Sequence, residues 1–245
     1  MSYIDYSVEI RSLNFDSKFK IESIYDGIKK IIIFQKNDNK DTWIRFFIEE
    51  KIVEPEIARK LTKKAMENIL NKIAFNTANY IGIPMIRSEI TKKSSKGYGK
   101  IKSVRTLCKK TDSQELNEIF NCLEKNYEKE SFYFELYRSA LQIKNEIARF
   151  LFLYSILFDL INSDKKKSSQ GNVDDFIRNQ NKNVKEKKTT RFNKEYLETI
   201  YTYYRNQVSH TNENSNIKEI RNKITNLVDK LSKLVKVAIK RKNLV

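Results

Sequence analysis

Apolar residues recur at intervals of three and four along much of the chain, which is the period of an amphipathic helix. In the first part of the sequence this pattern predicts a helix over 17–32, a second helix after Asp41, and a third that starts at Pro55 and runs to about residue 80. The helical period is absent over 83–111, where the string SSKGYGK contains two glycines. We expect a short hairpin or a loop there.

The second part of the sequence shows the helical period more clearly. It predicts a short helix over 115–125, a long one over 130–162, one that begins at Asn193, and a last one from Ile217 to the end. The segment 164–191 is polar, basic and nearly free of core residues, so we expect a mobile insertion there. A loop that closes over a bound strand is the alternative.

Composition agrees with a mainly α fold, because five glycines and two prolines are few for a protein that needs many tight turns. With 40% hydrophobic residues the chain should fold rather than stay disordered. We expect a small helical region over 1–111, with a regulatory or substrate-recognising role inferred from its position only, followed by a helical bundle over 112–245.

Net charge is +17, which favours binding to a polyanion such as RNA. An AT-rich genome would produce part of the same lysine excess without any function. The first residues do not resemble a secretory signal, and the longest apolar stretch is too short for a membrane span, so we expect a cytoplasmic protein. Cys108, Cys122 and a single histidine cannot form a zinc site of the usual spacing, and we expect no metal and no cofactor.

The candidate chemistry lies in YYRNQVSHTNEN, residues 203–214. On a helix that begins at Asn193, Arg205, Asn206 and His210 lie about 80°, 180° and 140° from the centre of the apolar stripe. All three side chains should therefore point away from the core, which argues against a purely structural histidine. Imidazole can transfer protons near neutral pH, and a guanidinium can hold a phosphate through two hydrogen bonds. This set suits cleavage of RNA, whose 2′-hydroxyl is the nucleophile.

The pattern RNQVSH, with Arg205, Asn206 directly after it and His210 five residues on, resembles the signature of the HEPN superfamily. The order of helices in the C-terminal half also resembles that of HEPN bundles. The resemblance implies a metal-independent endoribonuclease that works as a homodimer with a composite site. Arg205 would then bind the scissile phosphate, His210 would be the general acid or base, and Asn206 would orient them. The products would carry a 2′,3′-cyclic phosphate and a 5′-hydroxyl.

The resemblance also implies a role as a toxin or phage-defence effector acting on single-stranded RNA or tRNA, with an antitoxin or activator that the sequence does not identify. Asn212 stands where HEPN toxins silenced by nucleotidylation have tyrosine, which puts that route in doubt. Glu146 is a candidate for the acidic residue that many members place near the motif, although a solvent-facing charge is the better interpretation. A catalytically silent RNA-binding or regulatory module and a structural adaptor with a chance motif remain the alternatives.

Overall fold

The structure is a computed structural model that describes residues 2–10, 13–36, 39–98, 111–124, 131–191, 194–210 and 216–242. The chain divides into two compact units, Met1–Arg138 and Ser139–Val245, called here the N-terminal and the C-terminal unit. This division lies further along the chain than the boundary expected at residue 111.

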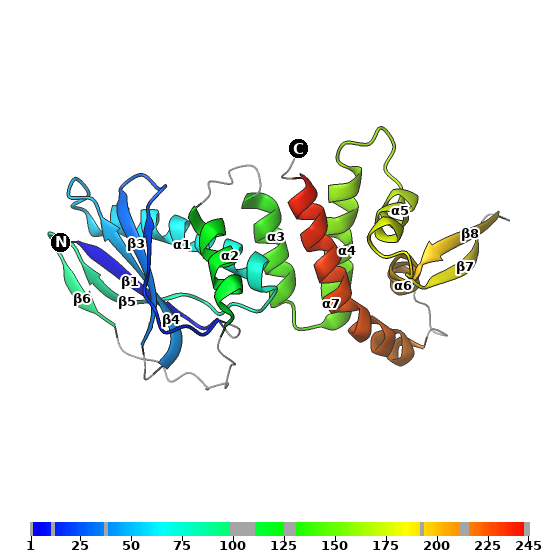
Figure 1. The fold of residues 1–245 in the computed structure, drawn as a ribbon, viewed down its shortest axis with the longest axis horizontal. Coiled ribbons are helices and arrows are strands. Elements are labelled where there is room, and N and C mark those ends of the chain that lie inside the picture. The colour runs from blue at the N-terminus through cyan, green and yellow to red at the C-terminus, as the bar shows by residue number, and fades with distance from the viewer. Residues whose placement is uncertain are drawn as a thin grey trace. The chain divides into compact units, whose positions relative to one another are not determined.

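A six-stranded antiparallel sheet forms the centre of the N-terminal unit, with the strand order β2-β3-β4-β1-β5-β6 (Figure 1). Its strands are β1 (Tyr3–Val8), β2 (Phe19–Glu22), β3 (Ile28–Lys36), β4 (Asn39–Ile48), β5 (Met85–Ile90) and β6 (Ser95–Gly97). The last two strands form a hairpin in the segment where a hairpin or a loop was expected. The mainly α fold that composition favoured is therefore wrong, because the chain combines helices with a large antiparallel sheet.

The two helices predicted before Pro55 are wrong, because residues 19–48 form β2, β3 and β4. Buried side chains alternate along these strands: Ile31 and Ile33 lie on the same face as Ile44 and Phe46, and all four are at most 1% exposed. Isoleucine is β-branched and packs well on a pleated surface. The dense run of isoleucines also fits a helical spacing, which is why the pattern predicted a helix instead of strands.

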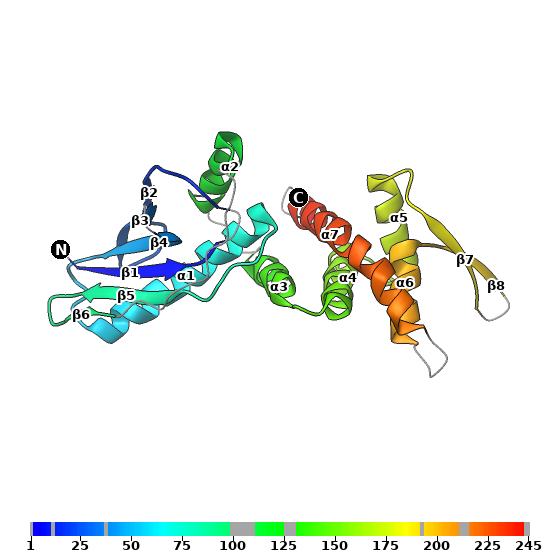
Figure 2. The same ribbon diagram turned by 90° about the horizontal axis from the view of Figure 1, so that it is seen from below.

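Helix α1 (Pro55–Thr77) packs on one face of the sheet, and the prediction of a helix that begins at Pro55 is confirmed (Figure 2). On this face the Tyr6 hydroxyl lies 3.0 Å from Thr62 Oγ1. Glu89 of β5 is fully buried and accepts a hydrogen bond of 2.7 Å from Arg59 Nε of α1. Helix α2 (Ser113–Glu124) contacts both α1 and β2, close to where a short helix was predicted.

Helices α4 (Glu146–Asn162) and α7 (Ile217–Lys242) lie side by side in the C-terminal unit (Figure 1). The last predicted helix is confirmed as α7, whereas the single long helix over 130–162 is wrong. That stretch contains α3 (Ser131–Gln142) and α4, and α4 has its own start because the side chain of Asn145 accepts a hydrogen bond from Ala148 N. In the described part of the chain, no helix is long and apolar enough to cross a membrane.

The expectation that 164–191 is nearly free of core residues is also wrong. This segment contains helix α5 (Gln170–Gln180), which buries Val173, Phe176 and Ile177, and strand β7 (Glu186–Arg191). Strand β7 pairs with β8 (Lys194–Thr199) in a two-stranded sheet, and β8 leads directly into α6 (Ile200–Ser209). The motif helix thus begins at Ile200 rather than at Asn193.

Candidate functional site

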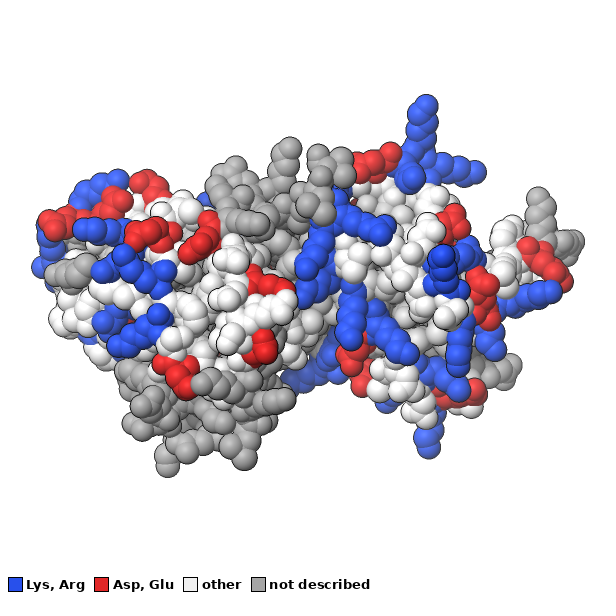
Figure 3. All heavy atoms as spheres, in the orientation of Figure 1, with Lys and Arg blue, Asp and Glu red and all other residues white. Residues whose placement is uncertain are grey.

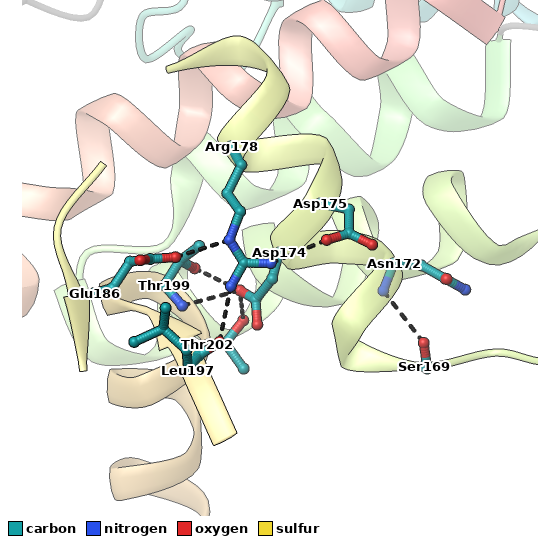
Figure 4. A network of polar contacts seen from close by, with 9 residues as sticks. All are labelled: Ser169, Asn172, Asp174, Asp175, Arg178, Glu186, Leu197, Thr199 and Thr202. Atoms are coloured by element: carbon teal, nitrogen blue, oxygen red, sulfur yellow. Dashed lines mark hydrogen bonds and ion pairs between the residues drawn. The ribbon is translucent and has the colours of Figure 1, made fainter. Parts of the chain in front are cut away.

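The start of the motif helix α6 is fixed by Asp174, a buried carboxylate of α5. Its Oδ1 accepts hydrogen bonds from Thr199 N at 3.2 Å, Thr199 Oγ1 at 2.6 Å and Thr202 Oγ1 at 2.6 Å (Figure 4). Thr199 is the residue that precedes the first turn, where backbone N–H groups lack partners within the helix and a negative charge is favourable. Burial raises the pKa of Asp174, and the hydrogen bonds from the two threonines oppose this shift.

Tyr154 of α4 extends this network across the unit. Its hydroxyl lies 2.8 Å from Thr202 Oγ1, and both groups are buried. Because Thr202 donates its only hydroxyl proton to Asp174, Tyr154 must be the donor to Thr202. Burial raises the pKa of Tyr154, and the hydrogen bond with Thr202 and, more weakly, the positive charge of Arg205 oppose this shift. These bonds connect α4, α5 and α6 in a defined arrangement.

Arg178 attaches the other side of α5 to the two-stranded sheet (Figure 4). Its guanidinium donates to Glu186 on β7 at 2.7 Å and to the carbonyl oxygen of Leu197 on β8 at 2.7 Å. Since β8 continues into α6, this contact also helps to fix where the motif helix begins.

Asn206 is only 6% exposed, so the prediction that its side chain points away from the core is wrong. The predicted angle assumed one helix from Asn193, with Tyr196 and Leu197 in the buried stripe. Both residues instead belong to β8 and are 43% and 51% exposed. Within α6 the buried residues include Thr202, which lies one turn before Asn206 on the same side.

The amide of Asn206 has all of its hydrogen-bonding capacity satisfied. Its Oδ1 accepts from Gln170 Nε2 at 2.9 Å and from Arg205 Nη1 at 3.0 Å. Its Nδ2 donates to Gln170 Oε1 at 3.2 Å and to Glu198 Oε1 at 3.3 Å. An amide offers two acceptor and two donor positions, and all four are used. Asn206 therefore holds its neighbours in place and has no free group for a ligand.

Arg205 is half-buried, and its bond to Asn206 uses one of its five N–H donors. His210 is exposed and ends α6, with its backbone N–H bonded to Asn206 O at 3.0 Å. The structure thus brings Arg205 and Asn206 into direct contact and places His210 at the exposed end of the same helix. Among the described residues, no hydrogen bond joins the side chain of His210 to either of them.

Two residues of this site were not identified in the sequence. Gln170 lies in the segment that was expected to be a mobile insertion, and Glu198 lies on β8, where it is 5% exposed. The carboxylate of the candidate acidic residue Glu146 accepts a hydrogen bond from Thr225 of α7. Asn212 lies outside the described residues. No group of three or more histidine, cysteine, aspartate or glutamate residues in the described ranges could hold a metal ion.

The comparison with protein families gives one match. The family model described as methylamine utilization protein MauJ matches residues 133–240, a range that covers most of the C-terminal unit. No curated protein and no solved structure matches the chain.

Proposed function

We propose that the C-terminal unit is a HEPN-like, metal-independent endoribonuclease whose reacting groups are Arg205 and His210. The observation that carries the proposal is the geometry at the end of α6. A guanidinium with free donors is held by a buried amide, and an exposed imidazole ends the same helix. The description of the MauJ family names no reaction, so the proposal rests on these side chains and on the resemblance of RNQVSH to the HEPN signature.

In the proposed reaction the 2′-hydroxyl of RNA attacks the adjacent phosphorus, and the bond to the 5′-oxygen of the next nucleotide breaks. Arg205 stabilises the negative charge on the phosphate oxygens. His210 takes the proton from the 2′-hydroxyl or gives a proton to the departing oxygen. The products are a 2′,3′-cyclic phosphate and a 5′-hydroxyl. Asn206 acts as a positioning residue, because it contacts Arg205 and has no hydrogen-bonding group left for substrate.

A homodimer fits this chemistry. The reaction needs a base for the attacking hydroxyl and an acid for the leaving oxygen, and each chain has a single histidine. Two chains that bring their α6 ends to one cleft would supply both groups. A toxin or phage-defence role for such an enzyme remains a prediction.

The test is incubation of the purified protein with end-labelled single-stranded RNA and with a tRNA pool, in the presence of EDTA. We expect cleavage by the wild type and a loss of about 10²- to 10⁴-fold in His210→Ala, the usual contribution of a general acid or base. Arg205→Ala should be similarly impaired. Gln207→Ala is the matched control, because Gln207 is an exposed residue of the same helix and should retain activity.

Three results would contradict the proposal. Cleavage that EDTA abolishes would exclude the metal-independent mechanism, and full activity in His210→Ala would remove the histidine from it. A monomer under native mass measurement that is still fully active would exclude the composite site. Binding of RNA without cleavage by any variant would favour the silent RNA-binding module instead.

A further inference from the structure

Helix α7 carries an unusual concentration of positive charge, with nine lysine and arginine residues against the acids Glu219 and Asp229. Figure 3 shows a band of basic side chains at the position of α7 in Figure 1. Four exposed lysines, Lys223, Lys230, Lys233 and Lys240, fall within an arc of about 100° and extend over about 25 Å of helix. They lie on the side of α7 that faces away from its buried residues, and we call them the α7 lysine row.

Within the ranges that the structure describes, none of the lysines of this row has a carboxylate as an ion-pair partner. In the N-terminal unit, by contrast, Lys20, Lys51 and Lys93 each pair with a glutamate or an aspartate. No ion pair among the described residues therefore holds these lysines, and their charge is available to an external anion.

The row lies on a helix that contacts α6, the helix of the candidate site. Helix α7 contacts α6, and it begins at Ile217, shortly after His210 ends α6. Exposed positions between the lysines are polar and include Asn226, whereas most apolar residues of α7, such as Leu227 and Leu231, are buried. A surface with spaced cations, and with Leu234 and Val237 only partly exposed, suits a polyanion in water better than a lipid layer.

We propose that the α7 lysine row binds the phosphate backbone of the RNA substrate and directs the strand toward the end of α6. The inference rests on the proposed function for its choice of RNA. Contacts of this kind carry no sequence information, so the row would raise affinity for any RNA strand and would set its path rather than the cleaved base.

The experiment compares two triple variants in a His210→Ala background, which keeps the RNA intact. One replaces Lys223, Lys230 and Lys233 with glutamine. The control replaces Lys165, Lys166 and Lys167, three exposed consecutive lysines of the same unit, with glutamine and so removes the same charge. Binding of a fluorescent single-stranded 20-mer is measured by fluorescence anisotropy in EDTA from 50 to 200 mM salt.

For a single strand, each phosphate contact contributes about −0.7 to the slope of the logarithm of the association constant against the logarithm of salt concentration. Loss of three contacts should therefore make this slope shallower by about 2. At 0.1 M salt this corresponds to an affinity about 10- to 100-fold weaker. The control variant should keep the slope of the parent. Equal losses in both variants, or no loss in the row variant, would overturn the proposal. So would row-dependent binding to phosphatidylserine vesicles without any binding to RNA.

The outcome is separable from that of the nuclease assay, because binding is measured without cleavage. Row-dependent RNA binding in a protein that never cleaves RNA would support the surface and refute the enzyme. Cleavage by the wild type combined with unchanged binding in the row variant would support the enzyme and refute the surface.

Discussion

The carboxylate of Asp174 should be a principal stabilising contact of the C-terminal unit, and Asp174→Ala tests this. The substitution removes three hydrogen bonds, from Thr199 N, Thr199 Oγ1 and Thr202 Oγ1. Hydrogen bonds to a charged group contribute about 1.5 kcal/mol or more each, which gives about 4.5 kcal/mol for three. Removal of a buried charge returns part of this, because burial raises the pKa of Asp174 and so disfavours its charged form. We expect a net loss of about 3 kcal/mol in the free energy of unfolding.

The neighbouring residue provides a matched control. Asp175 has a side chain that is 71% exposed and forms an ion pair with Arg178 three residues later on the helix surface. Such a pair contributes less than about 0.5 kcal/mol, so Asp175→Ala should change stability little. The two variants have the same change of residue type in the same helix and differ in burial and in hydrogen bonding.

The assay is urea unfolding at pH 7 followed by far-UV circular dichroism. With slopes of about 1 to 3 kcal/mol per molar urea, a loss of 3 kcal/mol lowers the midpoint by about 1 to 3 M. Trp43 is the only tryptophan and lies in the N-terminal unit, so its fluorescence follows that unit separately. A loss under about 1 kcal/mol for Asp174→Ala, or a loss no greater than that of Asp175→Ala, would refute the reasoning.

Two further predictions concern the buried carboxylate of Glu89 and the titration of Asp174. Arg59→Met should lower the free energy of unfolding of the N-terminal unit by about 2 kcal/mol, measured by Trp43 fluorescence, because it leaves the buried carboxylate of Glu89 without its partner. The loss is moderate because the side chain of Arg59 is 38% exposed, so water reaches its end of the ion pair. Folding raises the pKa of Asp174, so the folded state binds the proton of this carboxyl group more tightly than the unfolded state does. The stability of the C-terminal unit should therefore fall as pH rises from the ordinary carboxyl pKa of about 3.9 through the raised pKa. Asp174→Asn should lose this dependence.

Each of these predictions has a clear contrary result. An effect of Arg59→Met no larger than that of Lys51→Met, which removes exposed ion pairs, would show that the buried carboxylate does not need its partner. Curves of stability against pH that are parallel for the wild type and Asp174→Asn between pH 3 and pH 7 would exclude Asp174 as the source of the change.

Helices α1 and α7 were predictable from the sequence, whereas the strands before Pro55 were not. Helices α1 and α7 each bury one stripe, and the stripe is visible in the residue pattern. Strands β3 and β4 bury every second residue over much of their length, but apolar residues are so frequent there that a helical spacing also fits. Helix α5 did leave a signal, since Val173, Phe176 and Ile177 have helical spacing, but lysine-rich segments on either side obscured it.

The candidate site was predictable only in its local part. Arg205 and His210 lie on one short motif, so the sequence alone brings them to one helix end. The partners of Asn206 come from two other elements, with Gln170 lying 36 residues away along the chain. Such contacts depend on how α5 and β8 pack against α6, and no spacing in the sequence encodes them.

The burial of Asn206 gives a physical reason for an amide directly after Arg205. Consecutive residues on a helix point about 100° apart, so one can face the interior while the other lies at its edge. The interior residue must accept a hydrogen bond from Arg205 and donate one to Glu198. Aspartate could accept but not donate, and it would place a second carboxylate beside Glu198, whereas leucine could do neither. Asparagine meets both needs in the space of one short side chain, so its place in the motif follows from holding the arginine in position.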